Sequence, residues 1–135
     1  MKKHLLSLIF TLALLIPVGL MAQSGETAKG KRGGYLASGD QKLFFEIVDD
    51  GTKISFYPCD KEGNMLKVVP TEANVTIAFL SSSEVFNLQG VQLQDGAFTV
   101  VPARTYPVYI YSLSYTYNDQ QGAVKFRNPD SPQPR

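Results

Sequence analysis

The chain has few of the side chains that carry common enzyme chemistry. Its 135 residues include one cysteine, one histidine and no tryptophan. The histidine, His4, lies in an N-terminal segment that we expect to be cleaved, so the mature chain would contain none. Without histidine, a serine or cysteine nucleophile lacks its usual general base, and zinc lacks its usual ligand cluster. We therefore predict no catalytic residues, no enzyme activity and no cofactor.

The acidic residues do not suggest a catalytic pair either. Most of them lie in predicted turns, where an aspartate usually caps its own backbone. Glu46 is the exception, because it lies within a predicted strand between aromatic and aliphatic residues. We interpret it as an outward-facing strand residue, and a functional carboxylate is the alternative.

The N-terminal segment has the organisation of a secretory signal peptide. Lys2 and Lys3 precede an almost wholly apolar stretch over residues 5–20, and the small Ala22 follows. This order of charge, apolar core and small residue is what signal peptidase recognises. We predict a signal peptide over residues 1–22, a periplasmic or secreted mature chain, and no stable membrane anchor after cleavage.

Cleavage would also change the charge of the chain. The full sequence has a net charge of +1, and removal of Lys2 and Lys3 leaves 11 basic against 12 acidic side chains, a net charge of −1. A protein that binds nucleic acid needs a basic excess to hold the phosphate backbone. We therefore predict that the chain does not bind nucleic acid.

Composition divides the mature chain into three parts. Residues 23–32 are small, polar and charged, which is typical of a flexible linker. Residues 128–135 carry three prolines and are predicted to be a tail. The folded domain is therefore predicted over residues 33–127.

The predicted domain consists of strands nearly throughout. Residues 41–48 alternate between apolar and polar side chains, which is the pattern of a half-buried strand. Turn signals recur about every 8–12 residues, a spacing typical of an antiparallel sandwich. We predict an all-β fold, an immunoglobulin-like β-sandwich of seven or eight short strands, with a bulge or a change of strand at Gly90. The predicted strands are 41–48, 52–59, 66–69, 75–80, 85–94, 97–103, 107–117 and 123–127.

A row of tyrosines is the most distinctive feature of the strand predicted over residues 107–117. Tyr109, Tyr111, Tyr115 and Tyr117 fall on one face of this strand. Rings at this spacing could stack on the sugars of a glycan or on a partner protein. The alternative is aromatic packing between strands, because tyrosine is common in strands for that reason alone.

Two sulfur atoms lie on either side of the turn predicted over residues 60–64. Cys59 precedes the turn and Met65 follows it. Thiolate and thioether groups are ligands that Cu(I) prefers, so the pair is a candidate metal site. The alternative is ordinary packing, with Cys59 as a buried free thiol.

Three stretches, 32–35 (RGGY), 45–48 (FEIV) and 54–57 (ISFY), together with Asp60 and Gly63, carry a family resemblance. In this order they resemble small exported immunoglobulin-like β-sandwich modules associated with bacterial heavy-metal efflux systems. The resemblance extends over about residues 32–127 by pattern, and it implies a metal-handling accessory role. Arg32 stands where the family often has histidine, so a metal role would lack that ligand here.

These observations favour a small exported, non-catalytic protein with a binding or accessory role in the cell envelope. Its partner would be another envelope protein, or a glycan on the tyrosine face. One alternative is a periplasmic metal-handling accessory of an efflux system. A second alternative is a structural subunit that pairs through a sheet edge.

Overall fold

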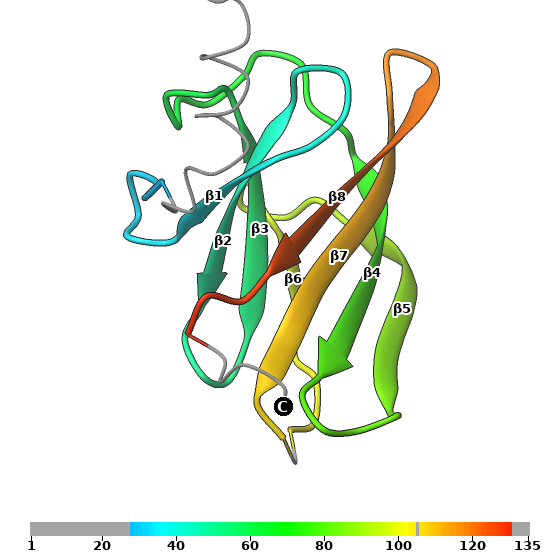
Figure 1. Ribbon diagram of the computed structural model, residues 1–135. Helices are drawn as coiled ribbons and strands as arrows, with labels where there is room; N and C mark the ends of the chain where they lie inside the picture. Colours follow the sequence, from blue (N-terminus) through cyan, green and yellow to red (C-terminus); the bar gives the residue numbers. More distant parts are fainter. Residues whose placement is uncertain (1–27, 105, 131–135) are drawn as a thin grey trace, which may run out of the picture.

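The computed structural model of the chain describes residues 28–104 and 106–130. These residues form two antiparallel sheets of four strands each, with no helix among them, which confirms the predicted all-β sandwich architecture (Figure 1). Within the same ranges, no helix is long and apolar enough to cross a membrane. The predicted signal peptide, residues 23–27 of the predicted linker and residues 131–135 of the predicted tail lie outside the described residues.

The first sheet has the strand order β1-β2-β3-β6, and the second has the order β5-β4-β7-β8. The edge strand β1 of the first sheet contacts β8 of the second, and β6 contacts β5 at the other side. The strands are β1 (Tyr35–Ser38), β2 (Phe44–Asp49), β3 (Ile54–Cys59), β4 (Glu72–Phe79), β5 (Val85–Gln92), β6 (Phe98–Val100), β7 (Val108–Tyr117) and β8 (Gln120–Arg127).

The core lies between the two sheets and is built from alternate residues of each strand. Aromatic rings join the sheets at two levels. The ring centroids of Phe45 and Tyr115 are 5.1 Å apart, and those of Phe56 and Tyr111 are 6.4 Å apart in an edge-to-face arrangement. Offset and edge-to-face contacts are the favoured geometries of buried rings. These four aromatic residues, two from each sheet, therefore fix how the sheets pack.

The hairpin between β7 and β8 turns on two residues, Asn118 and Asp119. Their φ angles are 52° and 61°, which is the left-handed pair that a two-residue hairpin turn with the right strand twist requires. The predicted turn over 118–122 is therefore shorter in the structure, and β8 begins at Gln120.

One predicted strand is absent. Residues 66–69 were predicted to form a strand, but they are irregular, because this segment carries the chain from β3 in the first sheet to β4 in the second. Such a crossing leaves no neighbouring strand for the segment to pair with. The predicted bulge at Gly90 is confirmed: Ala73 pairs with Val91 and Val75 with Leu88, so one β4 residue faces two β5 residues.

Candidate functional site

The structure buries two of the four tyrosines of the predicted row and leaves the other two, Tyr109 and Tyr117, half-buried. Tyr111 and Tyr115 are only 2% and 4% exposed and belong to the core. Tyr117 is half-buried, and its hydroxyl donates to the Val68 carbonyl at 3.1 Å. A register shift between β4 and β7 falls at Tyr109, whose ring lies 5.4 Å from the guanidinium carbon of Arg127. The four rings therefore do not form one exposed surface, and the packing alternative describes the two central ones.

The hydroxyls of the two buried tyrosines anchor loops to the core. Tyr111 donates to Asp49 Oδ2 at 2.9 Å, and Asp49 also forms an ion pair with Arg104, with Oδ1 and Nη2 2.7 Å apart. Burial, together with the charge of Asp49, raises the pKa of Tyr111 far above its usual value. Tyr115 donates to the Asp40 carbonyl at 2.9 Å, and burial raises the pKa of Tyr115 to about 12. Both hydroxyls are therefore neutral hydrogen-bond donors over the ordinary pH range.

Glu46 is fully buried, which corrects its interpretation as an outward-facing residue. It does point away from the core side of β2, but the segment before β1 folds over it. Its Oε2 accepts hydrogen bonds from the backbone N–H groups of Arg32 at 2.7 Å and Gly34 at 3.0 Å. Its Oε1 pairs with Nη1 of Arg32 at 3.2 Å. Three donors satisfy the buried carboxylate, so it is held as a structural anchor.

This covering segment, residues 28–34, is called the N-terminal strap below. It includes residues 28–32 of the predicted linker, which are therefore part of the fold. The N–H of Gly30 donates to the Gly34 carbonyl at 2.9 Å, and the Arg32 guanidinium lies 4.0 Å from the centroid of the Tyr57 ring. A Cβ atom at Gly30 would overlap the Glu46 carboxyl group, so only glycine fits the strap against this side chain.

The two sulfur atoms lie in contrasting environments. Cys59 is buried, and desolvation raises the pKa of its thiol to about 11. Met65 is 73% exposed. A buried neutral thiol is a poor metal ligand, since the thiolate is the binding form. In the described part of the chain, no group of three or more histidine, cysteine, aspartate or glutamate residues could hold a metal ion.

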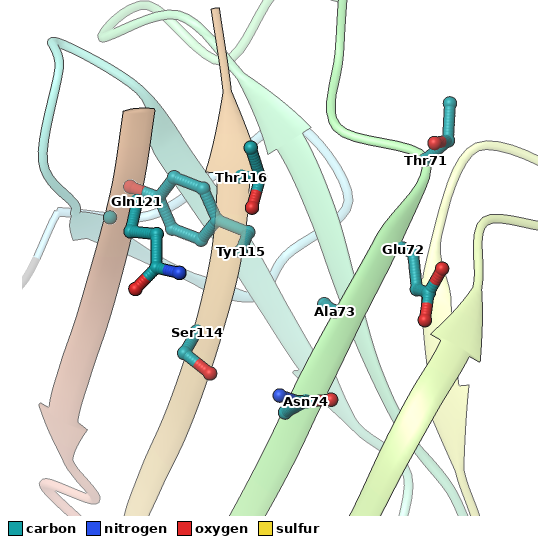
Figure 2. A pocket seen from close by; sticks show the side chains of 9 residues that line it. Thr71, Glu72, Ala73, Asn74, Ser114, Tyr115, Thr116 and Gln121 are labelled. Carbon is teal, nitrogen blue, oxygen red and sulfur yellow. The ribbon is translucent and has the colours of Figure 1, made fainter. Parts of the chain in front are cut away.

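The outer face of the second sheet carries a polar trough of about 470 Å³ (Figure 2). Glu72 and Asn74 come from β4, Ser114 and Thr116 from β7, and Gln121 from β8. Hydroxyl, amide and carboxylate groups of this kind can hydrogen-bond a polyhydroxylated ligand. The lining contains one aromatic residue, Tyr115, and its ring is buried. The trough therefore lacks the exposed ring on which a sugar would stack, and a glycan partner stays a prediction.

The four sheet edges differ in how they meet solvent. The edge of β1 is covered by the N-terminal strap. The Leu36 N–H donates to the Ala28 carbonyl at 2.9 Å, and Lys29 forms an isolated antiparallel β-bridge with Tyr35. The edge strand β6 has only three residues, and Pro102 follows it closely. Covering segments, short strands and proline are all means by which proteins prevent edge-to-edge pairing.

The edge of β8 is blocked at its midpoint by Asp40, from the loop between β1 and β2. The Asp40 N–H donates to the Ala123 carbonyl at 3.2 Å, and the Ala123 N–H donates to Asp40 Oδ2 at 3.0 Å. One residue therefore satisfies both backbone groups that Ala123 would offer to another strand. The charges of Lys125 and Arg127 on the same strand add to this protection.

The edge of β5 has neither protection. Its eight residues (VFNLQGVQ) contain no charge, and no segment among the described residues pairs with its outer side. Val85 and Leu88 are 54% and 45% exposed. The bulge at Gln89 and Gly90 is its one irregularity, and it leaves residues 85–88 as a regular edge. An uncharged, partly apolar edge of this kind is a template for another strand.

No protein-family model, curated protein or solved structure matches the chain significantly. Among the surfaces of the described residues, the β5 edge is uncharged and paired on one side only, so it can accept another strand. Local pattern alone did not single it out. The signal available in the sequence is the run of residues 85–94, which carries no charged side chain.

Proposed function

We propose that the mature chain is a small exported, non-catalytic binding module of the cell envelope, and that its partner adds a strand to β5. The observation that carries this proposal is the contrast among the four edges. Three of them are covered, blocked or very short, whereas β5 is long, uncharged and open. A protein that protects its other edges and leaves one free is suited to pairing there.

Strand addition has a clear physical basis at this edge. Every second residue of an edge strand directs its backbone N–H and C=O away from the sheet, and an added strand would pair with these groups. Val85 and Leu88 lie on opposite faces of β5, so a partner strand would cover apolar surface on both sides. Backbone hydrogen bonds would supply affinity, and these side chains would supply selectivity.

The topology supports an immunoglobulin-like type for the sandwich. With β1 left aside, β2-β3-β6 follows the order A-B-E of such domains, and β5-β4-β7-β8 follows the order C′-C-F-G. We infer that β1 is an additional strand placed before strand A. By analogy with the wider use of this architecture, the scaffold is compatible with a binding module.

The environment of the buried carboxylate supports the non-catalytic part of the proposal. Glu46 is a carboxylate within a strand, and its oxygens are bound by Arg32 and Gly34 away from solvent. A general acid or base must reach the substrate, and this group is occupied and closed off.

Site-specific photo-crosslinking in the envelope of a Gram-negative host tests the proposed surface. A photoreactive residue would replace Asn87 on β5 or, as a matched control, Lys125 on β8; both positions are exposed. We expect a discrete protein adduct from position 87 and none from position 125. No adduct at position 87, or equal adducts at both positions, would contradict the proposal. The mass of the adduct reports what the partner is.

A further inference from the structure

We infer that the strand added to β5 is β5 of a second copy of this chain, antiparallel and centred on Asn87. This inference rests on the proposed function and identifies its partner. A symmetric pair of this kind would join the two second sheets into one continuous sheet of eight strands, in the order β8-β7-β4-β5-β5-β4-β7-β8. Two-fold pairing of the same surface is the commonest form of protein association.

The regular part of the edge sets the register. Glu84 precedes β5, and the bulge opposite Asn74 involves Gln89 and Gly90. The regular segment is therefore 85–88, so a symmetric pair would be centred on Phe86 or Asn87. A two-fold axis perpendicular to the sheet keeps the core face of both copies on the same side. Opposite residues must then point to the same face, which requires that the axis passes beside a residue that faces its own copy and not between two residues.

Neighbouring registers are less favourable than the one centred on Asn87. An axis at Phe86 would place the charged Glu84 opposite Leu88 of the second copy. An axis at Leu88 would place the bulge, at Gly90, opposite Phe86. With the axis at Asn87, Phe86 of each copy lies opposite Leu88 of the other, and Val85 lies opposite Gln89.

The exposure of the side chains fits this pairing. Phe86 and Leu88 pair with Ile77 and Val75 of β4, both fully buried, so all four lie on the core side of the sheet. Phe86 packs partly against the core, whereas Leu88 is 45% exposed. In the symmetric pair, Phe86 of the second copy would cover Leu88. Aromatic and aliphatic residues directly opposite each other are favoured cross-strand pairs.

The absence of charge favours a second copy over another partner. In a symmetric pair, a charged residue at the axis faces its own copy, and like charges directly opposite each other destabilise a sheet. The eight residues of β5 contain none. A different protein that is selected by opposite charge would instead require charged residues on this strand, as interfaces that discriminate between partners by charge do.

Disulfide trapping tests the register. The Cα atoms of directly opposite residues lie about 4.5–5.5 Å apart, within the range that a disulfide spans, so Asn87→Cys should form a disulfide with the same residue of the second copy. In a Cys59→Ala background, we expect it to oxidise to a covalent dimer about tenfold faster than Ser114→Cys, an exposed control on β7. Val85→Cys and Gln89→Cys should each cross-link slowly alone, and they should link to each other when the two proteins are mixed. Equal rates for Asn87→Cys and Ser114→Cys would overturn the register.

Light scattering or sedimentation of the unmodified chain purified after export tests the association itself. We expect twice the chain mass, and a dissociation constant raised about tenfold or more by Asn87→Lys but unchanged by Ser114→Lys. A monomer at all concentrations, or a dimer that Asn87→Lys leaves intact, would overturn the inference. If the crosslink from position 87 then joins a different protein, the proposed function survives; if it joins nothing, both fail.

Discussion

The two edge strands of the second sheet, β8 and β5, meet solvent in opposite ways. Asp40 occupies the middle of β8 with two hydrogen bonds to Ala123, and the strand carries charged side chains. β5, at the other edge of the same sheet, carries no charge and is paired on one side only. Both strands are edges of the same sheet. The difference in how their edges are protected therefore comes from the segment that covers β8 and from the side chains of each strand.

The protection of β8 depends on the core. The hydroxyl of Tyr115 holds the Asp40 carbonyl, so a residue buried between the sheets fixes the loop that blocks the edge. The β1 edge has a similar arrangement, in which buried Glu46 holds the N-terminal strap. The closed edges are thus part of the cooperative structure, whereas exposed residues of the open edge, such as Val85, can change without disturbing the core.

The largest expected effect is at Tyr115. Tyr115→Ser removes a buried ring and the anchor of Asp40, and we expect it to lower the free energy of unfolding by about 3–5 kcal/mol. Val85→Ser on the open edge should change it by less than about 0.5 kcal/mol. Urea denaturation measures both. A loss below about 1 kcal/mol for Tyr115→Ser would show that the ring is not part of the core, and would support its alternative role in an exposed binding surface.

Glu46→Gln should have the next largest effect. The amide cannot accept from both backbone N–H groups and also pair with Arg32, so we expect a loss of about 2–3 kcal/mol. Release of the N-terminal strap should also speed hydrogen exchange at the Leu36 amide, which donates to Ala28. Glu62→Gln, in an exposed turn, is the control. Unchanged exchange at Leu36 would mean that the strap does not depend on this carboxylate.

Asp40→Ala should open β8 at a smaller cost. One hydrogen bond from the Ala123 N–H is lost, which corresponds to about 1 kcal/mol. We expect faster amide exchange at Ala123. We also expect this variant to associate through its β8 edge, which the unmodified protein would not do. Asp119→Asn, which keeps a residue that tolerates the left-handed φ of the hairpin turn, should show neither effect. If amide exchange at Ala123 is unchanged, the charged side chains of β8, and not Asp40, protect this edge.

The smallest effect is expected in alkaline solution. The pKa of Tyr115 is raised to about 12, so the unfolded tyrosine ionises first and stability falls as pH rises above about 10. Tyr115→Phe should therefore show a shallower decline, by less than about 0.5 kcal/mol at pH 10. Paired denaturation curves at pH 8 and 10 measure this difference. Parallel declines in the two proteins would contradict the raised pKa.

Much of the fold could be predicted from local pattern. Alternation at Leu43, Phe45 and Ile47 correctly identified the buried face of β2, because a half-buried strand repeats every two residues. Glu46 was misjudged because its cover comes from the N-terminal strap, and no local pattern reports a distant segment. The strand prediction for residues 66–69 was wrong for a related reason, since a strand exists only where a neighbouring strand can pair with it.

The candidate site was less accessible to sequence reasoning. Which strand lies at an edge depends on topology, and the run of uncharged residues gains meaning only once β5 is known to end the sheet. The face of the tyrosines was predicted for Tyr111 and Tyr115, but whether that face is core or surface depends on the opposing sheet. At Tyr109, the register shift against β4 broke the alternation.

The two ends of the described residues, Ala28 and Asp130, indicate where a label or support can be attached. Ala28 pairs with β1 at the Leu36 amide, and Asp130 accepts a hydrogen bond from the Tyr35 hydroxyl, so both ends of the described chain meet at β1. β5 lies at the far side of the sandwich (Figure 1). A biotin, dye or solid support attached at Ala28 or Asp130 would therefore leave β5 facing the solution. Surface-based measurements can display the open edge in one uniform orientation.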